Sequence, residues 1–558
     1  MNHAVYHLTF LLGILLLFNS SLAKAQVPPD PTGETTPLDR IEPLPTLPPE
    51  PEEPVDLEEA PQPIPEPENI PPVSFFVEDI QVVGNTLFQS EIEGLISPLA
   101  GREITLEEML ALRTAITQLY VENGYISSGA FVPTNQVLDD GLVEIQVIEG
   151  AVEQLQINGL GHLREGYVRD RVAPATAPPL NVRRLEEALQ LLQVDPLLQG
   201  VDAELTAGSG PGQNILILDL AEADPFFTTF GFDNARAPSI GSYQGTVSVN
   251  HLNVLGFGDR FSASYNLTEG LDTYDIDYAI PVNGLDGRFA ISYQNAESEI
   301  VDEQFRDAGI RSNSETFSIN FRQPLTRSLT NEFALSLGLD FRESRSFILD
   351  DIPFSFSIGP EEGVSRVRAL RFGQEWVNRD INSVVAARSQ FSIGLDAFGA
   401  TVNDTGTDGH FLAWLGQFQW VEQFSPGTRL VTRINAQLTP DSLLPLERFS
   451  VGGVDTVRGY AQNQIVTDNA ITASTEFRFP IADNLQLTPF VDAGGGWNNL
   501  TPNPDPSFLL GLGLGLRWQP NDVFGMRLDY GIPIISPGEE GNSLQENGVY
   551  FSVSLQPF

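Results

Sequence analysis

The chain contains no cysteine, one lysine and five histidines among its 558 residues. Without cysteine it has no disulfide framework and no Cys-based metal or redox site. Beyond residue 25 no run of about 18 apolar residues occurs, which excludes a helical membrane protein. Because Lys24 is the only lysine, arginine supplies nearly all the positive charge, and the formal net charge is -44. This excess of negative charge excludes nucleic acid as a binding partner and excludes polybasic adhesion to membranes, because both kinds of binding need clustered Lys and Arg.

The sequence also lacks the motifs of common enzyme sites. It contains no G-x-S-x-G nucleophile elbow and no H-E-x-x-H pair. The glycines at 256 and 258, and those from 511 to 515, are not dinucleotide loops because no β-α unit surrounds them. Asp350-Asp351 is interpreted as solvated loop charge rather than a calcium site or a catalytic dyad. We therefore predict no enzyme, no catalytic residue, no cofactor and no metal.

The first 72 residues are predicted to lie outside any folded domain. Residues 1–25 have the pattern of a signal peptide, with an apolar core over Leu8–Phe18 and a small-x-small site at Ala23-Lys24-Ala25. A buried N-terminal helix is the alternative. Residues 26–72 are dominated by Pro and Glu and are predicted to be a disordered, extended acidic linker.

Two consecutive units of similar pattern follow, at 73–150 and 151–222. In the first, Thr105-Leu106-Glu107-Glu108 is a capping box that opens a helix, and strands are predicted around 130–133 and 142–148. In the second, Asn181 can cap a helix, and strands are predicted over 201–206 and 214–220. Each unit reads β-α-α-β-β, so the fold class of this part is α+β and the chain contains an internal repeat.

From residue 223 to 558 the pattern is that of a transmembrane β-barrel. Segments of roughly ten residues alternate apolar with polar side chains, as where Ile471, Ala473 and Thr475 alternate with Thr472 and Ser474. About sixteen such segments occur, an even number that suits an antiparallel barrel. We predict an all-β, 16-stranded antiparallel barrel whose tryptophans form an interfacial girdle. A soluble β-sandwich or propeller is the alternative.

One stretch interrupts this alternation. Residues 449–466, which contain Val457-Arg458-Gly459-Tyr460, follow the eleventh predicted strand and are too glycine-rich to continue it. Phe490-Val491-Asp492-Ala493-Gly494 lies in the thirteenth strand, where alternation turns Phe490, Asp492 and Gly494 to the lumen. We predict that the loop folds into the barrel and that Arg458 pairs with Asp492. The alternative is that both are unrelated, solvated charges.

The wall beside this loop is predicted to be unusually bare. In the fourteenth strand Leu510, Leu512, Leu514 and Leu516 face lipid, and the glycines at 511, 513 and 515 face inward. A lumen surface without side chains leaves room for another segment to lie against it. We expect that segment to be the returning loop.

These motifs resemble those of a known superfamily. Val457-Arg458-Gly459-Tyr460 is similar to the VRGY motif in the sixth extracellular loop of BamA-like outer-membrane proteins, and Phe490-Val491-Asp492-Ala493-Gly494 is similar to their F-x-D-x-G barrel motif. The two N-terminal units resemble POTRA domains. Two such units before a 16-stranded barrel resemble the layout of two-partner secretion transporters (TpsB), the ShlB/FhaC/HecB haemolysin secretion/activation family. The resemblance implies that Arg458 and Asp492 form a salt bridge and that Phe558 is a barrel assembly signal, although Pro557 places Phe558 off the alternation.

The resemblance also implies a function and partners. The protein would sit in the outer membrane of a diderm bacterium, with its POTRA domains in the periplasm, and would secrete a large unfolded exoprotein (TpsA-like) after binding its N-terminal secretion domain. Other partners would be outer-membrane lipids and the barrel assembly machinery, with no nucleic acid. β-Augmentation onto 201–206 or 214–220 is the expected mode of capture, if either edge is free. Relatives often carry a pore-plugging N-terminal helix, for which residues 26–72 offer no convincing candidate. An insertase of the same superfamily and a passive porin are the alternatives.

Overall fold

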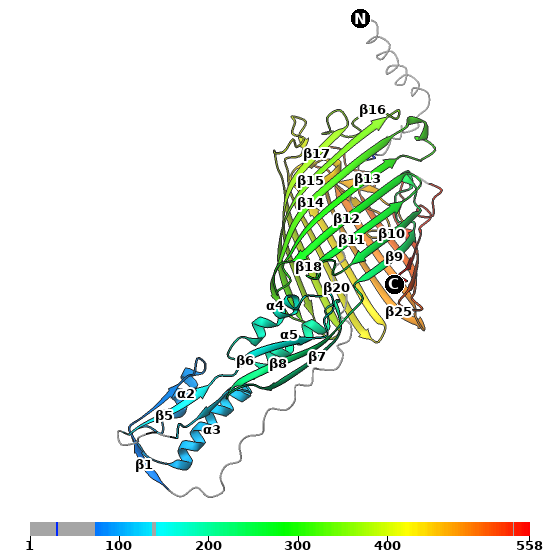
Figure 1. Ribbon diagram of the computed structural model, residues 1–558. Coiled ribbons are helices and arrows are strands. Elements are labelled where there is room, and N and C mark those ends of the chain that lie inside the picture. The colour runs from blue at the N-terminus through cyan, green and yellow to red at the C-terminus, as the bar shows by residue number, and fades with distance from the viewer. Residues whose placement is uncertain (1–29, 32–72, 135, 137–140, 539–540, 558) are drawn as a thin grey trace.

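In the computed structural model the chain forms a narrow arm of two small units joined to a tall barrel (Figure 1). The structure describes residues 30–31, 73–134, 136, 141–538 and 541–557. The predicted signal peptide, most of the predicted linker and Phe558 lie outside the described residues. Pro31 is buried, and its carbonyl oxygen accepts a hydrogen bond from Ser298 Oγ of the barrel at 3.3 Å. No helix in the described ranges is long and apolar enough to cross a membrane.

The first unit packs two helices against a small sheet. Its elements are β1 (Ser74–Val77), β2 (Asp79–Val83), α2 (Gln89–Ile96), β3 (Arg102–Thr105), α3 (Leu106–Glu122), β4 (Gly129–Phe131) and β5 (Leu142–Ile148). The capping box is confirmed, because Thr105 Oγ1 accepts from Glu108 N and Thr105 N donates to Glu108 Oε2 at 2.8 Å. The predicted order β-α-α-β-β omitted β1 and β3. These two strands pair with each other as a separate two-stranded sheet beside the sheet β2-β5-β4.

The second unit has the elements that the sequence indicates. They are β6 (Ala151–Asn158), α4 (Glu165–Thr176), α5 (Val182–Gln193), β7 (Leu198–Ala207) and β8 (Gln213–Glu222). The Asn181 side chain caps α5 by accepting from the backbone of Arg183 and Arg184. Leu185, Leu189 and Leu192 recur at helical spacing, share the buried face of α5 and pack on the sheet.

A pair of glutamates shows that the two units are built alike. Glu149 follows β5 and accepts from the backbone of Thr86 and Leu87, at 2.7 and 3.2 Å. Glu222 ends β8 and accepts from three backbone N–H groups at residues 161–163, between 2.6 and 3.3 Å. The carboxylate thus fastens the end of the last strand to the loop that follows β2 in the first unit and to the loop that follows β6 in the second.

Sheet order decides which strand edges are available in the second unit. The order is β6-β8-β7, so β8 is hydrogen-bonded on both sides. The expectation that residues 214–220 could offer an edge is therefore wrong, because that segment is the central strand. Within the described residues β7 pairs with β8 alone, which leaves the segment 201–206 as an outer strand.

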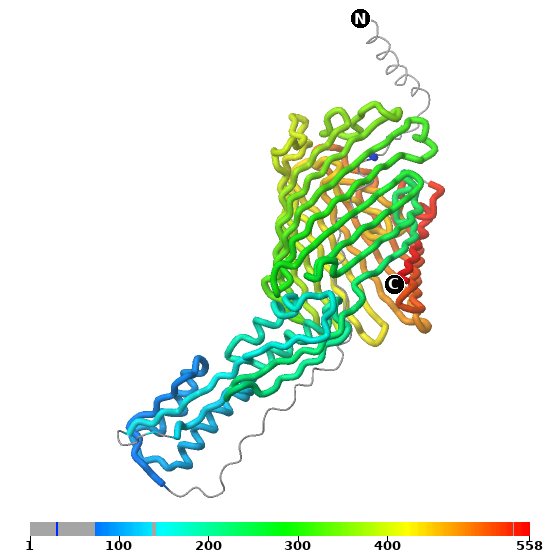
Figure 2. The backbone as a smooth tube through the Cα atoms, viewed as in Figure 1, coloured from blue at the N-terminus to red at the C-terminus, as the bar shows by residue number. Residues whose placement is uncertain are grey.

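The C-terminal part confirms the prediction of a closed barrel of sixteen antiparallel strands. These are β9 (Phe226–Asp233), β10 (Gln244–His251), β11 (Arg260–Leu267), β12 (Leu271–Pro281), β13 (Arg288–Glu299), β14 (Arg311–Arg327), β15 (Asn331–Ile348), β17 (Val364–Arg379), β18 (Ser383–Gly394), β20 (Leu412–Ser425), β21 (Thr428–Leu438), β25 (Asn469–Ala482), β26 (Leu485–Trp497), β27 (Phe508–Trp518), β28 (Phe524–Pro533) and β29 (Val549–Leu555). A two-residue strand, β16 (Ile352–Pro353), extends the sheet beside β15. The first and last strands, green and red in Figure 2, close the cylinder.

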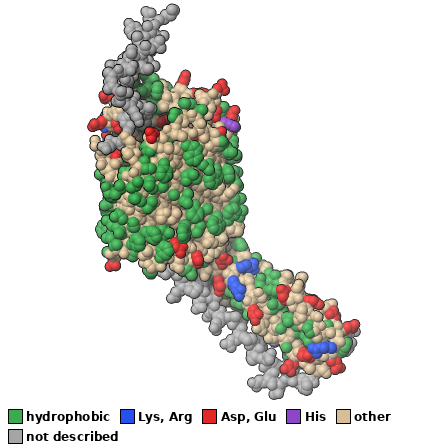
Figure 3. Space-filling model, turned by 180° about the vertical axis from the view of Figure 1, so that it is seen from behind, with side chains coloured by type: hydrophobic (Ala, Val, Ile, Leu, Met, Phe, Trp, Pro, Cys, Tyr) green, Lys and Arg blue, Asp and Glu red, His purple; other side chains and the backbone are tan. Residues whose placement is uncertain are grey.

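Side chains on the barrel follow the alternation read from the sequence. In β25, Ile471 and Phe477 are exposed on the outside, whereas Thr472 and Glu476 are each only 2% exposed on the lumen side. Figure 3 shows apolar side chains gathered in a broad band over the outer face of the barrel. Four of the five tryptophans, at 376, 420, 497 and 518, are exposed on the barrel, as an interfacial girdle requires.

Candidate functional site: a loop folded into the barrel

The segment between β21 and β25 folds into the lumen. It begins earlier than residue 449 and contains β22 (Ser442–Leu443), the 3-10 turn η6 (Pro445–Glu447), β23 (Phe449–Val451) and β24 (Ile465–Thr467). β23 and β24 pair as an antiparallel hairpin. Most residues of the segment are buried even though it connects two strands of the barrel, so the barrel wall encloses it. We call residues 439–468 the inward loop.

Glycine and threonine shape the tip of this loop. Gly452, Gly453 and Gly459 have φ values of 118°, 90° and 103°, which side chains other than glycine rarely adopt. Between the first two and the last, the Thr456 hydroxyl closes a tight turn by accepting from Gly452 N at 2.8 Å and donating to Gly452 O at 2.9 Å. The turn directs Val457 and Arg458 at the wall formed by β25 to β28.

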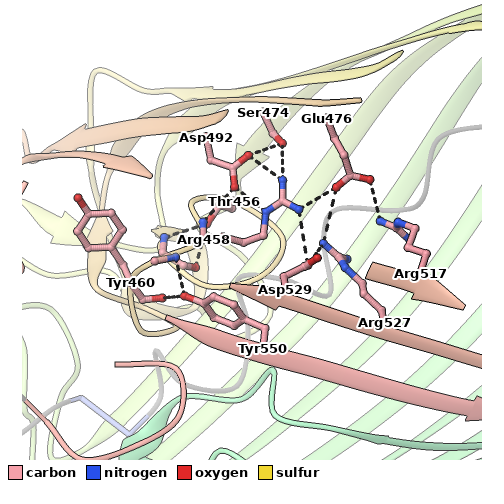
Figure 4. Close-up of polar contacts among 12 residues, drawn as sticks. Thr456, Arg458, Tyr460, Ser474, Glu476, Asp492, Arg517, Arg527, Asp529 and Tyr550 are labelled. Atoms are coloured by element: carbon pink, nitrogen blue, oxygen red, sulfur yellow. Dashed lines mark hydrogen bonds and ion pairs between the residues drawn. The ribbon is translucent and has the colours of Figure 1, made fainter. Parts of the chain in front are cut away.

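The structure brings Arg458 and Asp492 together (Figure 4). The guanidinium binds the carboxylate through two parallel bonds, Nε to Oδ2 at 2.7 Å and Nη2 to Oδ1 at 2.9 Å. The backbone N of Arg458 also donates to Asp492 Oδ2 at 3.1 Å. Phe490, the other large residue of the wall motif, lies flat under the charge, with its ring centre 3.4 Å from the guanidinium carbon. Both charged residues are at most 2% exposed, and a bidentate pair of this kind is the strong form of an ion pair.

Two further carboxylates complete the charge cluster, and sequence reasoning did not assign them to the site. Glu476 of β25 accepts from Arg458 Nη1 at 2.8 Å, and Asp529 of β28 lies 3.6 Å from the same nitrogen. Glu476 also contacts Arg517, and Asp529 contacts Arg527 (Figure 4). Arg478 is a further partner of Glu476, at 2.9 Å. Alternation had placed these charges on the inner face. Their convergence on one point depends on the register of four strands, which no local pattern reveals.

The tyrosines bind backbone rather than charge. Tyr550 of β29 accepts from Gly459 N at 2.8 Å and donates to the carbonyl oxygen of Tyr460 at 2.6 Å. The Tyr460 hydroxyl lies 2.8 Å from Ile535 O and 3.0 Å from Leu510 O. Val457 is fully buried in an apolar cluster with Val451 and residues of β20, β25 and β27. The four residues of the VRGY motif therefore fasten the loop tip to the last strands of the barrel.

The inward-facing glycines of β27, at 511, 513 and 515, each lie against a different group. The expectation that all three accommodate the loop is therefore wrong. A Cβ at Gly511 would lie 1.9 Å from the carbonyl oxygen of Arg458, so this glycine does admit the loop backbone. At Gly513 the added atom would meet the Phe490 ring, and at Gly515 it would meet Asp529, so these two make room for wall side chains. Gly494 lies against Val451 and Val457 of the loop, which explains the glycine of the wall motif.

Within the described part of the chain, the lumen contains a large cavity lined mainly by polar and charged side chains. A cavity of about 820 Å³ lies beside the loop, lined by side chains of β11 to β18 that include Asp340, Arg371, Glu375 and Arg388. Opposite charges on this wall pair with one another, as Arg388 does with Glu375 at 3.0 Å. The cavity is lined by charged side chains of both signs, several of which form ion pairs. Among the described residues no cluster of His, Asp and Glu could hold a metal ion.

Comparisons with known proteins agree with this architecture. Residues 212–518 match the family model "Haemolysin secretion/activation protein ShlB/FhaC/HecB", and residues 75–150 match "POTRA domain, ShlB-type". The outer membrane transporter CdiB of Escherichia coli is 25% identical over 83% of this chain and 79% of its own length. The haem/hemopexin transporter protein HuxB of Haemophilus influenzae is 21% identical over 70% of this chain and 69% of its own. The solved structure of CdiB from Escherichia coli superposes with a TM-score of 0.65, covering 89% of this chain and 92% of that one at 23% identity.

Proposed function

The chain belongs to the ShlB/FhaC/HecB haemolysin secretion/activation family, and on that premise we propose that it is the outer-membrane pore of a two-partner secretion system. The observation that carries the proposal is a closed barrel with a polar lumen, preceded by two POTRA-like units and containing a buried loop fixed to the wall. The substrate is a large exoprotein that crosses the outer membrane unfolded. No catalytic step is part of this proposal.

Capture of the exoprotein is assigned to the periplasmic arm. An extended segment of its N-terminal secretion domain adds to an outer strand of a POTRA sheet through main-chain hydrogen bonds. Because β8 is central, β7 is the outer strand of the second unit that the sequence had singled out, and among the described residues it pairs with β8 alone. The arm also docks on the barrel, where Arg171 of α4 binds Asp286 of the β12–β13 turn at 2.8 Å. A segment held on the arm is thereby presented at the periplasmic mouth of the barrel.

Translocation is assigned to the lumen beside the inward loop. The lining there consists of charged, polar and small side chains apart from Tyr293, so it presents few large apolar side chains to which an unfolded chain could adhere. The Arg458 cluster sets the position of the loop in the conduit, and Asp492 and Glu476 are its partners on the wall. The exoprotein threads through while this loop is held or shifted, without ATP.

The experiment that tests the proposal is deletion of this gene in its own host, followed by complementation. The neighbouring reading frame is expected to encode a very long β-helical exoprotein, and deletion should leave that product in the periplasm and absent from the medium. An insertase of the same superfamily predicts a different outcome, in which many outer-membrane proteins are depleted together. Continued secretion in the deletion strain would refute the proposal.

A further inference from the structure

A second buried charge cluster fixes the inward loop at its other end. Glu447, in the 3-10 turn η6, is 1% exposed. Its carboxylate receives Arg371 in a bidentate arrangement, with Nη2 to Oε1 at 2.9 Å and Nη1 to Oε2 at 3.1 Å. Arg342 Nη1 donates to the same carboxylate at 3.2 Å and to the carbonyl oxygen of Leu446 at 2.8 Å. The loop therefore has a charged contact that does not involve its VRGY motif.

The two clusters lie on different sectors of the wall. Arg342 and Arg371 belong to β15 and β17, the seventh and eighth strands of the barrel. The partners of Arg458 belong to β25, β26 and β28, the twelfth, thirteenth and fifteenth strands. The two bidentate partners, Arg371 of the eighth strand and Asp492 of the thirteenth, are five strands apart in a cylinder of sixteen, and Arg342 and Asp529 lie half a circumference apart. The stretch from Glu447 to Arg458 thus spans between separated parts of the lumen.

The charges at the two ends have opposite signs. At Arg458 the loop supplies the cation and the wall supplies carboxylates, whereas at Glu447 the loop supplies the carboxylate and the wall supplies guanidinium groups. Each end can dock only on its own sector, because exchange would bring like charges together in a buried site. Apolar contacts reinforce the Glu447 end, where Leu443, Leu444 and Leu446 pack on lumen residues of β17 and on the start of β20.

We propose that Glu447 is a second anchor of the inward loop, so that the loop crosses the lumen as a strut fixed at both ends. Release of Arg458 alone then leaves the loop tethered to β15 and β17, and passage of the exoprotein requires both ends to yield. Glu447 is a positioning residue, since it acts on the path through the loop. The consequence for transport rests on the secretion pore proposed above, but loop position can be measured without an exoprotein.

The absence of cysteine allows a direct measurement of loop position. Val451 lies between the two anchors and is fully buried. A cysteine there behaves as a small apolar side chain and would react with a membrane-impermeant maleimide only when the loop leaves the wall. In Val451→Cys cells that lack the exoprotein, adding Glu447→Gln should raise the modification rate at least tenfold, which corresponds to about 1.4 kcal/mol in the free energy of release.

Glu375→Gln is the matched control. Glu375 is also a lumen carboxylate with two arginine partners, Arg322 at 2.7 Å and Arg388 at 3.0 Å, but both partners are on wall strands. Its substitution should change the rate less than twofold. Arg371→Gln should reproduce most of the effect of Glu447→Gln, and the double variant should add little to the Glu447 change, because both substitutions remove the bidentate pair between Glu447 and Arg371.

Heat-modifiable migration in gels verifies that each variant is a folded barrel. If Glu447→Gln does not assemble, Glu447→Asp serves in its place, since it keeps the charge but withdraws it by one methylene, and it should raise the rate at least threefold. An unchanged rate in the assembled variant overturns the second anchor, and so does an equal increase with Glu375→Gln. Either result leaves the secretion proposal intact, whereas continued secretion in the deletion strain would overturn that proposal and leave the anchor result standing.

Discussion

Substitution of Arg458 by alanine tests the central charge cluster of the inward loop. The wild-type Asp492 carboxylate has four donors, namely two guanidinium nitrogens, the backbone N of residue 458 and the Ser474 hydroxyl at 2.6 Å. Alanine removes the two charged donors and leaves Asp492 buried with neutral ones. Glu476 is less affected, because Arg478 and Arg517 remain within 3.0 Å.

The expected cost follows from this inventory. Removing one partner of a buried ion pair destabilises the folded arrangement by roughly 3 to 5 kcal/mol. We take the lower value for the free energy of loop docking, because Asp492 keeps two neutral donors. A loss of about 3 kcal/mol lowers the ratio of docked to released loop about a hundredfold. The barrel itself should persist, since its ladder does not pass through Arg458. We therefore expect the variant to be present in the outer membrane and inactive in secretion.

The assay compares exoprotein in the medium with exoprotein retained in the periplasm, at equal levels of heat-modifiable barrel. Arg478→Ala is the control, because it removes another arginine from Glu476 but lies on the wall and not on the loop. It should secrete nearly normally. Arg458→Lys should secrete at a level between those of the two alanine variants. A single ammonium group cannot form a bidentate contact with Asp492 and a hydrogen bond to Glu476 at the same time. Wild-type secretion by Arg458→Ala would refute the reasoning, as would equal losses in both alanine variants.

Three further changes test other parts of the structure. Gly511→Ala should displace the loop and abolish secretion, because its Cβ would lie 1.9 Å from a loop carbonyl, whereas Gly245→Ala, with nothing within 4 Å, should be silent. Asn234→Ala should lower the temperature of barrel unfolding in gels, because the Asn234 amide extends the β9–β29 seam by bonds to Val549 O and Phe551 N, together worth about 2 kcal/mol. Glu222→Gln should destabilise the arm at neutral pH by about 1 kcal/mol, measured by urea unfolding of the full chain in detergent.

The Glu222 variant should also change the pH dependence of that unfolding. Burial alone would raise the pKa of Glu222, but hydrogen bonds from the backbone N–H groups of residues 161–163 outweigh it and hold the pKa below the usual 4.5. A carboxyl whose pKa is lowered on folding stabilises the protein above pH 4.5, and this stability is lost as the pH falls through the lowered value. The difference between wild type and variant should therefore shrink below pH 4.5. A difference independent of pH would contradict the role of the charged form, and an unchanged melting temperature in Asn234→Ala would contradict the role of the seam.

The sequence alone determined the features that depend on neighbours along the chain. Alternation with a period of two separated the lipid and lumen faces of several barrel strands, and it placed Asp492 and Gly511 on the inner face. Local caps at Thr105 and Asn181 located two helices of the arm. The wall and loop motifs identified the pair of Arg458 and Asp492 through resemblance, since spacing alone left a solvated loop charge as the alternative.

Only the tertiary structure decided which of these residues meet. Sheet order made β8 a central strand, and strand register brought Glu476 and Asp529 to the guanidinium that sequence reasoning had given to Asp492 alone. The contact of Glu447 with Arg371 depends on where the loop crosses a cylinder, across 76 residues of chain. The physical reason is that the direction of a side chain follows from the local backbone geometry. Contacts between residues on opposite parts of the lumen depend instead on the shear of the whole barrel and on the path of the enclosed loop.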